Sequence, residues 1–226
     1  MQTTYNDVKK AVIRSQHCQR NWDLEKEISE ADLELLKHAV ANCPSKQNMA
    51  FYKVHFIQDR NVIESIHSKT DGFTYNFETS ETTTNSQVLA NLLVVFEATN
   101  PFYISDDEVR NDEWYEKKIK GQLSNTSAEN LIRDTHVAVG IAAGYANLTA
   151  SMLGLNTGCC SCYDADEVAK ILGADNNIML LMGIGFKNED RNRREHHSSD
   201  FVFPTKAKQK IQIIEKALIS NDEKID

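Results

Sequence analysis

One segment, residues 130–164, constrains the fold more than any other part of the chain. Within it, the run from Val137 to Ala146 contains no charged residue, and most of its side chains are small. A helix that is apolar on every face must be buried on every face, and a run of this length is too short to span a bilayer. The segment therefore predicts a core or interface helix, whose glycines and alanines allow another backbone to approach closely.

The sequence also marks both ends of this helix. Thr126 is followed three residues later by Glu129, which is the spacing of a capping box. After Gly154 the chain leaves the helix and enters a cysteine-rich stretch, residues 158–162, which we interpret as a tight polar turn. A buried helix of small residues that leads into such a turn indicates a functional site.

The composition favours one globular domain, residues 1–226. Of its residues, 41% are hydrophobic and 26% are charged, which is typical of a folded protein with a substantial core. The formal net charge of −8 argues against nucleic-acid binding. Neither the apolar core of a signal peptide nor a transmembrane run is found, so we expect a soluble, cytoplasmic protein that binds no membrane. In that setting we interpret the five cysteines as reduced thiols.

Hydrophobic periodicity predicts further helices and strands along the chain. The run 68–87 has no clear periodicity, and we expect either a functional loop or an element without a sequence signature. Residues 101–121 are expected to form a helical excursion that serves as a lid, and residues 198–226 a C-terminal extension. Helices are predicted at about 6–15, from Ser29 to Asn42, around 62–66, at 164–172 and through Ile211, Ile214 and Leu218, and strands at 52–57, 88–96 and 178–185.

Several familiar catalytic signatures are absent. There is no P-loop and no G-x-S-x-G elbow, and residues 183–185 lack the third glycine and the following helix of a dinucleotide fingerprint. Cys159, Cys160 and Cys162 do not form the two spaced pairs of a zinc site, and no His or Lys adjoins them to activate a thiolate. We expect no metal site and interpret the cysteines as small residues that fill a tight turn; a cysteine-based redox or metal sensor remains the alternative.

Three donor-rich turns each lie next to a predicted buried element: residues 16–20, 45–48 and 191–194. An anionic cofactor uses such a set. Flavin mononucleotide (FMN) needs cations for its phosphate, polar groups for the edge of its ring, and a backbone N–H near the ring atom N5. The backbone of Ser161 and Cys162, after the buried helix, is a candidate for the last of these contacts.

The order of these segments resembles the FMN-dependent nitroreductase family over nearly the whole chain. Residues 17–23, His-Cys-Gln-Arg-Asn-Trp-Asp, are similar to the family's opening phosphate and ribityl segment. Residues 44–48, Pro-Ser-Lys-Gln-Asn, are similar to its P-S-x-x-N turn beside the flavin. The later matches are Asp134 with the small-residue helix, the Leu-Gly-Leu at 153–155, the short helix after Asp164, and the apolar strand that ends in Gly185 and Phe186.

The resemblance implies an α+β fold. It implies a three-layer α-β-α sandwich, with a mixed, mostly antiparallel sheet flanked by helices, in an intertwined homodimer that binds FMN at the subunit interface. The implied reaction is ping-pong: NAD(P)H reduces the flavin, which then reduces nitroaromatics, quinones or related small-molecule acceptors. No side chain need act as a nucleophile, because the flavin N5 carries the chemistry. The alternative from another class is a flavin-binding storage or sensing protein without turnover.

The resemblance also implies which residues contact the cofactor. Three departures from the family pattern bear on the substrate: Cys18 replaces the usual Ser, the cysteines at 159–162 replace a Pro and Glu-Gly turn, and Ala-Phe-Tyr at 50–52 replaces Gln-Pro-Trp. The implied contacts are His17, Cys18 and Arg20 with the phosphate and ribityl end, Ser45 and Asn48 with the ring edge, Asn85 and Gln87 with the pyrimidine side, the backbone of Cys160, Ser161 and Cys162 with N5, and Arg193 and Arg194 with the phosphate.

Overall fold

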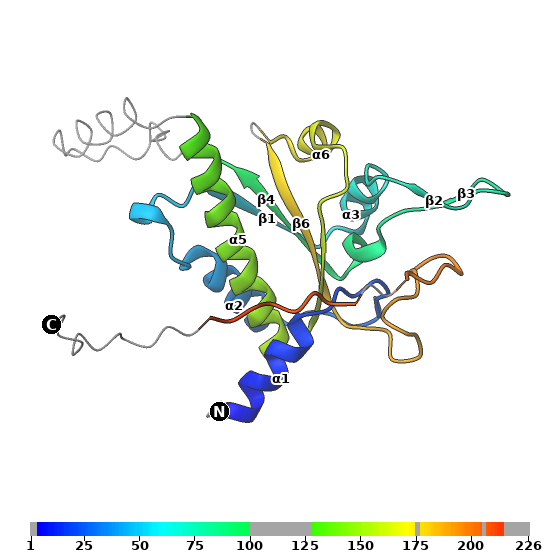
Figure 1. Cartoon of the computed structure of the whole chain (residues 1–226), viewed down its shortest axis with the longest axis horizontal. Helices are drawn as coiled ribbons and strands as arrows, with labels where there is room; N and C mark the ends of the chain where they lie inside the picture. The colour runs from blue at the N-terminus through cyan, green and yellow to red at the C-terminus, as the bar shows by residue number, and fades with distance from the viewer. Residues whose placement is uncertain (1–3, 100–127, 175–176, 205–206, 215–226) are drawn as a thin grey trace, which may run out of the picture.

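The computed structural model describes residues 4–99, 128–174, 177–204 and 207–214 (Figure 1). The expected excursion at 101–121 and the expected cap at Thr126 lie outside these residues. In chain order the elements are α1 (Tyr5–Ser15), α2 (Glu30–Ala41), η1 (Lys46–Asn48), β1 (Tyr52–Ile57), α3 (Arg60–His67), β2 (Phe73–Asn76), β3 (Glu81–Thr83), η2 (Ser86–Leu89), β4 (Leu92–Ala98), α5 (Ala128–Met152), β5 (Asn156–Cys160), α6 (Ala165–Leu172) and β6 (Ile178–Gly185), where η denotes a 3-10 helix.

A four-stranded sheet in the order β1-β4-β6-β5 forms the middle layer. All three of its strand pairings are antiparallel. Because successive side chains of a strand point to opposite faces, β4 supplies two cores. Leu92, Val94 and Phe96 belong to the core with α2 and α5, whereas Leu93 and Val95 belong to the core with α3, α6 and η2. Figure 1 shows these helices on either side of the sheet, which confirms the expected three-layer α-β-α arrangement.

Local signals set several helix boundaries where the sequence predicts them. Ser29 caps α2 by accepting a hydrogen bond from the backbone of Asp32, and Asp164 caps α6 by accepting one from Glu167. Gly173 ends α6 with a φ of 63°, a left-handed conformation that glycine adopts without strain. In the described part of the chain, no helix has the length and apolar character that crossing a bilayer requires.

Three predictions of secondary structure are wrong. The strand expected at 88–96 begins only at Leu92, because 86–89 form the turn η2, whose apolar side chains are buried beneath the sheet. The turn expected at 158–162 is largely strand: β5 continues through Cys160 as the edge of the sheet. The helix expected through Ile211 and Ile214 is absent from the described residues 207–214, which have no regular secondary structure and are exposed; Leu218 lies outside the described residues. The run 68–87, which carried no sequence signature, contains the hairpin β2–β3 and η2.

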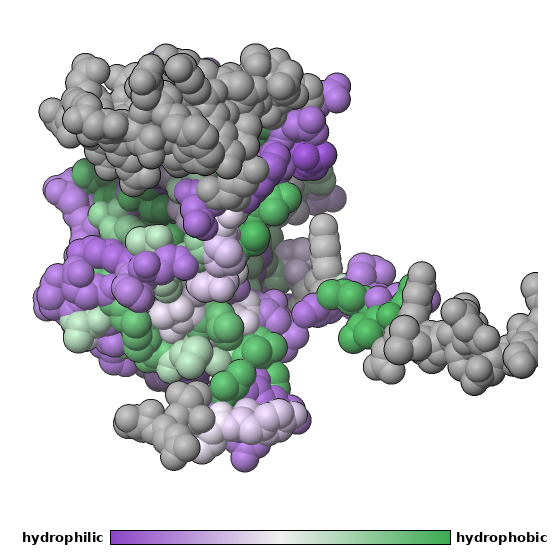
Figure 2. All heavy atoms as spheres, turned by 90° about the vertical axis from the view of Figure 1, so that its left-hand side faces the viewer, coloured by the Kyte–Doolittle hydropathy of each residue, from purple (hydrophilic) through white to green (hydrophobic). Residues whose placement is uncertain are grey.

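The central helix α5 is longer than its uncharged run and is buried on one side only. Val139, Ala142 and Ala146 are buried against the sheet and α2, whereas Val137 is 55% and Tyr145 is 44% exposed. The prediction of burial on every face is therefore wrong for the single chain. Figure 2 views the side of the molecule on which α5 and α2 lie and shows apolar side chains exposed there.

Candidate functional site

A pocket of about 630 Å³ brings together residues from both ends of the chain. It lies between the loop after α1, the start of the β2 hairpin, the end of β5 and the loop after β6. Of the twelve cofactor contacts expected from the sequence, its lining contains seven: His17, Cys18, Arg20, Asn85, Cys162, Arg193 and Arg194.

Backbone and buried side-chain contacts hold the loop 16–23 in place. The backbone N–H of Gln19 donates to the carbonyl of Thr157 in β5 at 2.8 Å, and that of Asp23 donates to Phe186 at 2.9 Å. Trp22, which is 2% exposed, donates its indole N–H to the carbonyl of Ser86 at 3.0 Å. Its backbone N–H donates to Nδ1 of His197 at 3.1 Å, which ties this loop to the loop after β6.

Arg20 is the central cation of the pocket. Its guanidinium lies 4.4 Å from the ring centroid of Phe203, a cation–π contact. Burial lowers the pKa of Arg20 from its ordinary value, and the neighbouring charge of Arg193 lowers it further. An arginine nevertheless stays protonated. Its Nε is buried and has no hydrogen-bond partner among the described residues. A half-buried, incompletely paired cation is the feature that an anionic ligand would satisfy.

The rim of the pocket carries a second cation, Arg193, beside the imidazole of His17. His17 is exposed, and partial burial together with the charges of Arg193 and Lys208 lowers its pKa from the ordinary value. Neither His17 nor Arg193 has a hydrogen-bond or ion-pair partner within the described parts of the chain. In a protein with a net charge of −8, this concentration of unpaired donors favours a phosphate over a neutral ligand.

Asn85 lines the pocket, whereas Gln87, which the resemblance also implied as a contact, lies behind the lining. Gln87 is 5% exposed, and its side-chain N–H group donates to the carbonyl of Cys159 at 3.3 Å and to Oδ1 of Asn85 at 3.4 Å. Its Oε1 is buried and has no partner among the described residues. Gln87 thus connects η2 to β5 behind the lining and holds the side chain of Asn85.

The end of β5 presents backbone donors rather than reactive thiols. Burial raises the pKa of Cys159 to about 12 and that of Cys160 to about 11, so both thiols stay protonated. This argues against a thiolate nucleophile at these two positions. The backbone N–H groups of Ser161 and Cys162 donate no hydrogen bond to the described part of the chain, although the carbonyl of Cys162 accepts one from Asp71 at 2.9 Å. Within that part, no cluster of His, Cys, Asp and Glu is arranged to hold a metal ion.

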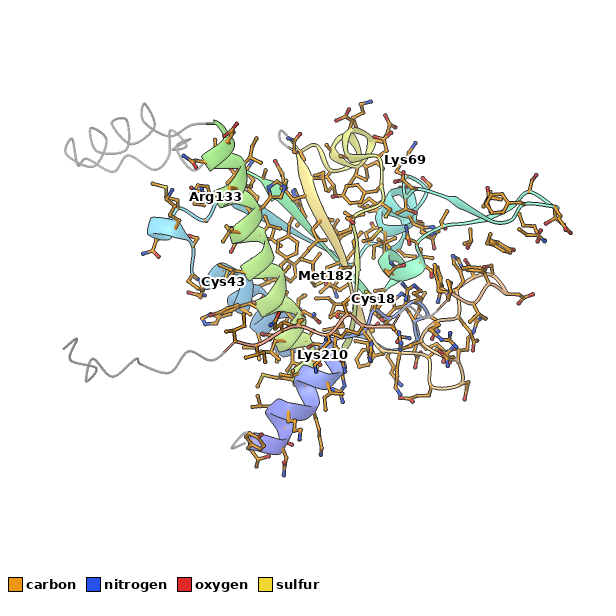
Figure 3. All side chains as sticks on the ribbon, in the orientation of Figure 1. Cys18, Cys43, Lys69, Arg133, Met182 and Lys210 are labelled. Carbon is orange, nitrogen blue, oxygen red and sulfur yellow. The ribbon has the colours of Figure 1, made fainter. Side chains whose placement is uncertain are left out.

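Ser45 and Asn48 are not brought to this pocket. Ser45 Oγ accepts a hydrogen bond from Ala50 at 2.9 Å, and Lys46 anchors the turn to α5 through an ion pair with Asp134 at 2.5 Å. Figure 3 shows Cys43, two residues before Ser45, across α5 from Cys18. Within one chain, the P-S-x-x-N turn and the phosphate segment are therefore on opposite sides of the central helix.

Phe203 is a pocket residue that the sequence did not predict. It packs against Arg20, contacts Phe201 edge-on at 5.0 Å and stacks on His196 at 6.1 Å between ring centroids. The contact with Arg20 joins residues more than 180 positions apart, and no local spacing in the sequence indicates it. Its one sequence signal is its position in an aromatic stretch after the loop 191–194.

Comparisons with known proteins agree with this architecture. The nitroreductase-family model matches residues 13–186. The search of curated proteins finds no match. A candidate nitroreductase from Exiguobacterium sibiricum, solved in complex with FMN, is 16% identical with a TM-score of 0.64, covering 85% of this chain and 92% of that chain. A candidate NAD(P)H:FMN oxidoreductase from Staphylococcus epidermidis is 19% identical with a TM-score of 0.61, covering 90% and 94%. The enone reductase CLA-ER of gut-bacterial fatty acid saturation is 17% identical with a TM-score of 0.64, covering 90% and 95%.

Proposed function

The chain belongs to the nitroreductase family, and from this premise we propose that it is an FMN-dependent oxidoreductase that uses NAD(P)H. The proposed acceptors are nitroaromatics, quinones or related small molecules, reduced in a ping-pong reaction. The observation that carries the proposal is the half-buried Arg20, whose buried Nε lacks a partner among the described residues, in a pocket lined by further cations.

The residues of this chain fit FMN in chemical type. His17, Arg20 and Arg193 would hold its phosphate, since charge-assisted hydrogen bonds are the strong ones. Asn85, which lines the pocket, would meet the polar edge of the ring, with Gln87 bound to it from behind. The free backbone donors of Ser161 and Cys162 would orient the ring. When bound, FMN supplies the atom N5 that exchanges hydride, so no side chain of the protein need react.

A flavin-binding protein without turnover is the second candidate, and a reduction assay separates the two. NADH or NADPH is added without oxygen to the protein loaded with FMN, and flavin absorbance is followed. The proposed enzyme bleaches and regains its colour when a quinone is added. A loaded protein that neither nicotinamide cofactor bleaches would contradict the enzyme and support the storage or sensing role. The high pKa values of Cys159 and Cys160 already disfavour a sensor that depends on their thiolates.

We propose a homodimer that uses the exposed face of α5. A Cβ atom added at Gly140 or Gly144 would meet no atom within 4 Å, so this face of α5 is open to another backbone. Val137 and Tyr145 add exposed apolar surface beside the two glycines. A partner packed here would bury that stripe. It would also bring its own Ser45 turn close to the pocket of the first subunit, whereas within one chain this turn and the pocket lie on opposite sides of α5.

Val137→Arg is expected to convert this dimer into a monomer and to lower its FMN content, because the charge would be desolvated at the interface. Light scattering coupled to size exclusion measures the mass, and absorbance measures the flavin. Leu24→Arg is the matched control, since Leu24 is also an exposed apolar residue, at 41%, but lies outside α5. A Val137→Arg protein with the wild-type mass and flavin content would exclude this face as the interface.

A further inference from the structure

A second pocket, of about 620 Å³, adjoins the first. His17 and Arg193 line both pockets, so the two meet at these residues. The second pocket is formed by the end of α1, the start of β5 and the segment after β6. We call it the Lys187 pocket and define it by Arg14, Lys26, Phe186, Lys187, Glu189 and Arg193.

The Lys187 pocket is strongly basic in an acidic protein. Five arginines and lysines line it, against one acid, Glu189. A concave surface of one sign focuses the electrostatic potential and attracts ions of the opposite sign. Because the whole chain carries a net charge of −8, this local excess of cations is not a consequence of composition.

The cations of this pocket differ in how they are engaged. Arg191 is held by Glu195 at 3.0 Å and by the carbonyl of His197 at 3.1 Å, so its role is structural. Arg14 donates to the carbonyl of Ser151 at 2.7 Å, a neutral partner that leaves its charge uncompensated. Arg14 therefore remains available to an anion, whereas Arg193, the proposed contact of the FMN phosphate, lies where the two pockets meet.

Lys187 is available as well. It pairs with Glu189 at 2.8 Å, but both side chains are at least half exposed. An exposed ion pair of this kind contributes little and is easily exchanged for a better partner. The carboxylate of Glu189 repels an anion in the pocket, and removing its charge would free Lys187 to bind that anion.

One wall of the pocket is aromatic. The ring of Phe186 is half-buried, and Nζ of Lys26 lies 5.8 Å from its centroid. Nucleotides bind where a base can stack on an aromatic ring and cationic side chains can donate to the phosphate. Simple inorganic anions would use the cations but not this wall.

We propose that the Lys187 pocket binds the phosphate-bearing adenosine of a nucleotide. This chemistry has two sources: the adenosine 2′-phosphate of NADPH, or a free adenine nucleotide. The first source rests on the proposed function and extends it, because it makes NADPH the preferred reductant. The second needs no flavin chemistry, so binding at this pocket can be tested whether or not the protein turns over.

Titration calorimetry with 2′,5′-ADP on the full-length protein tests the site. The wild type is expected to bind, and binding is expected to weaken as salt is raised. Lys187→Gln should weaken binding about fivefold and Glu189→Gln should tighten it by about as much. Both variants break the same ion pair, so a purely structural effect would change affinity in the same direction in both. Lys10→Gln is the control, because it removes a lysine of α1 that does not line this pocket.

Three results would overturn the site: no binding of 2′,5′-ADP to the wild type, changes of the same sign in both variants, or a change in Lys10→Gln as large as that in Lys187→Gln. The source is then identified by kinetics. A Lys187→Gln protein whose KM for NADPH rises relative to its KM for NADH supports the nicotinamide cofactor. Unchanged KM values together with weakened 2′,5′-ADP binding support a free nucleotide as the ligand.

Discussion

Gly183→Ala is expected to be strongly destabilising. A side-chain carbon at this position would lie 2.0 Å from the carbonyl oxygen of Gln87 and 2.9 Å from Cβ of Ala90. Strand β6 cannot move to relieve this clash, because Gly183 is paired with Leu93 on one side and Gly158 on the other. The backbone of η2 must shift instead, and the shift displaces the Gln87 side chain, which bonds Asn85 at the candidate pocket.

We expect Gly183→Ala to lower the free energy of unfolding by about 3 kcal/mol, the upper end of the usual cost of overpacking, because the clash is with backbone. Chemical denaturation measures this value. Gly72→Ala is the matched control, since its added carbon would be 3.6 Å from the nearest atom, an ordinary contact. That variant should stay within about 0.5 kcal/mol of the wild type. Equal stability of the two variants would show that η2 does not pack against β6 as described.

Arg20→Ala is expected to have the largest effect on cofactor binding. Loss of a charge-assisted hydrogen bond to phosphate costs about 1.5–3 kcal/mol, which corresponds to about a 10- to 150-fold weaker affinity for FMN. Arg20→Lys should be intermediate, because it keeps the charge but loses the planar fork. Quenching of flavin fluorescence on titration with the protein measures each affinity.

The same substitution should change the stability of the FMN-free protein little. It removes the contact with Phe203, but it also removes a buried cation that lacks a full set of partners. Weak FMN binding in a stably folded variant therefore separates a ligand contact from a folding defect. Lys69→Ala, which removes an exposed lysine paired with Glu167, should bind FMN as the wild type does. An Arg20→Ala protein with unchanged affinity would remove Arg20 from the site.

Much of the fold could be predicted because its boundaries are set by local chemistry. Ser29, Asp164 and Gly173 mark helix ends through hydrogen bonds or backbone conformations that need only neighbouring residues. The strand at 178–185 is likewise where its apolar run predicts it. An apolar run does not by itself identify a strand. Val88 and Leu89 continue the apolar run of β4, but they are buried because the turn η2 packs beneath the sheet.

The candidate site was only partly predictable. The phosphate segment around Arg20 and the loop with Arg193 were each marked by clustered donors, and the structure places them at one pocket. Phe203 was not predicted, because its contact with Arg20 exists only in the tertiary structure. The partial exposure of α5 could not be read from its composition either, since an uncharged helix face has the same sequence whether the core or a second subunit covers it.

The absorbance spectrum of the protein as purified tests the central claim most directly. If this pocket binds FMN, the purified wild type shows flavin absorption bands in the blue part of the visible spectrum, and the released cofactor has the mass of FMN. Arg20→Ala loses most of its FMN during the same purification. A colourless wild type that also binds no added FMN, while folded by circular dichroism, would contradict the account.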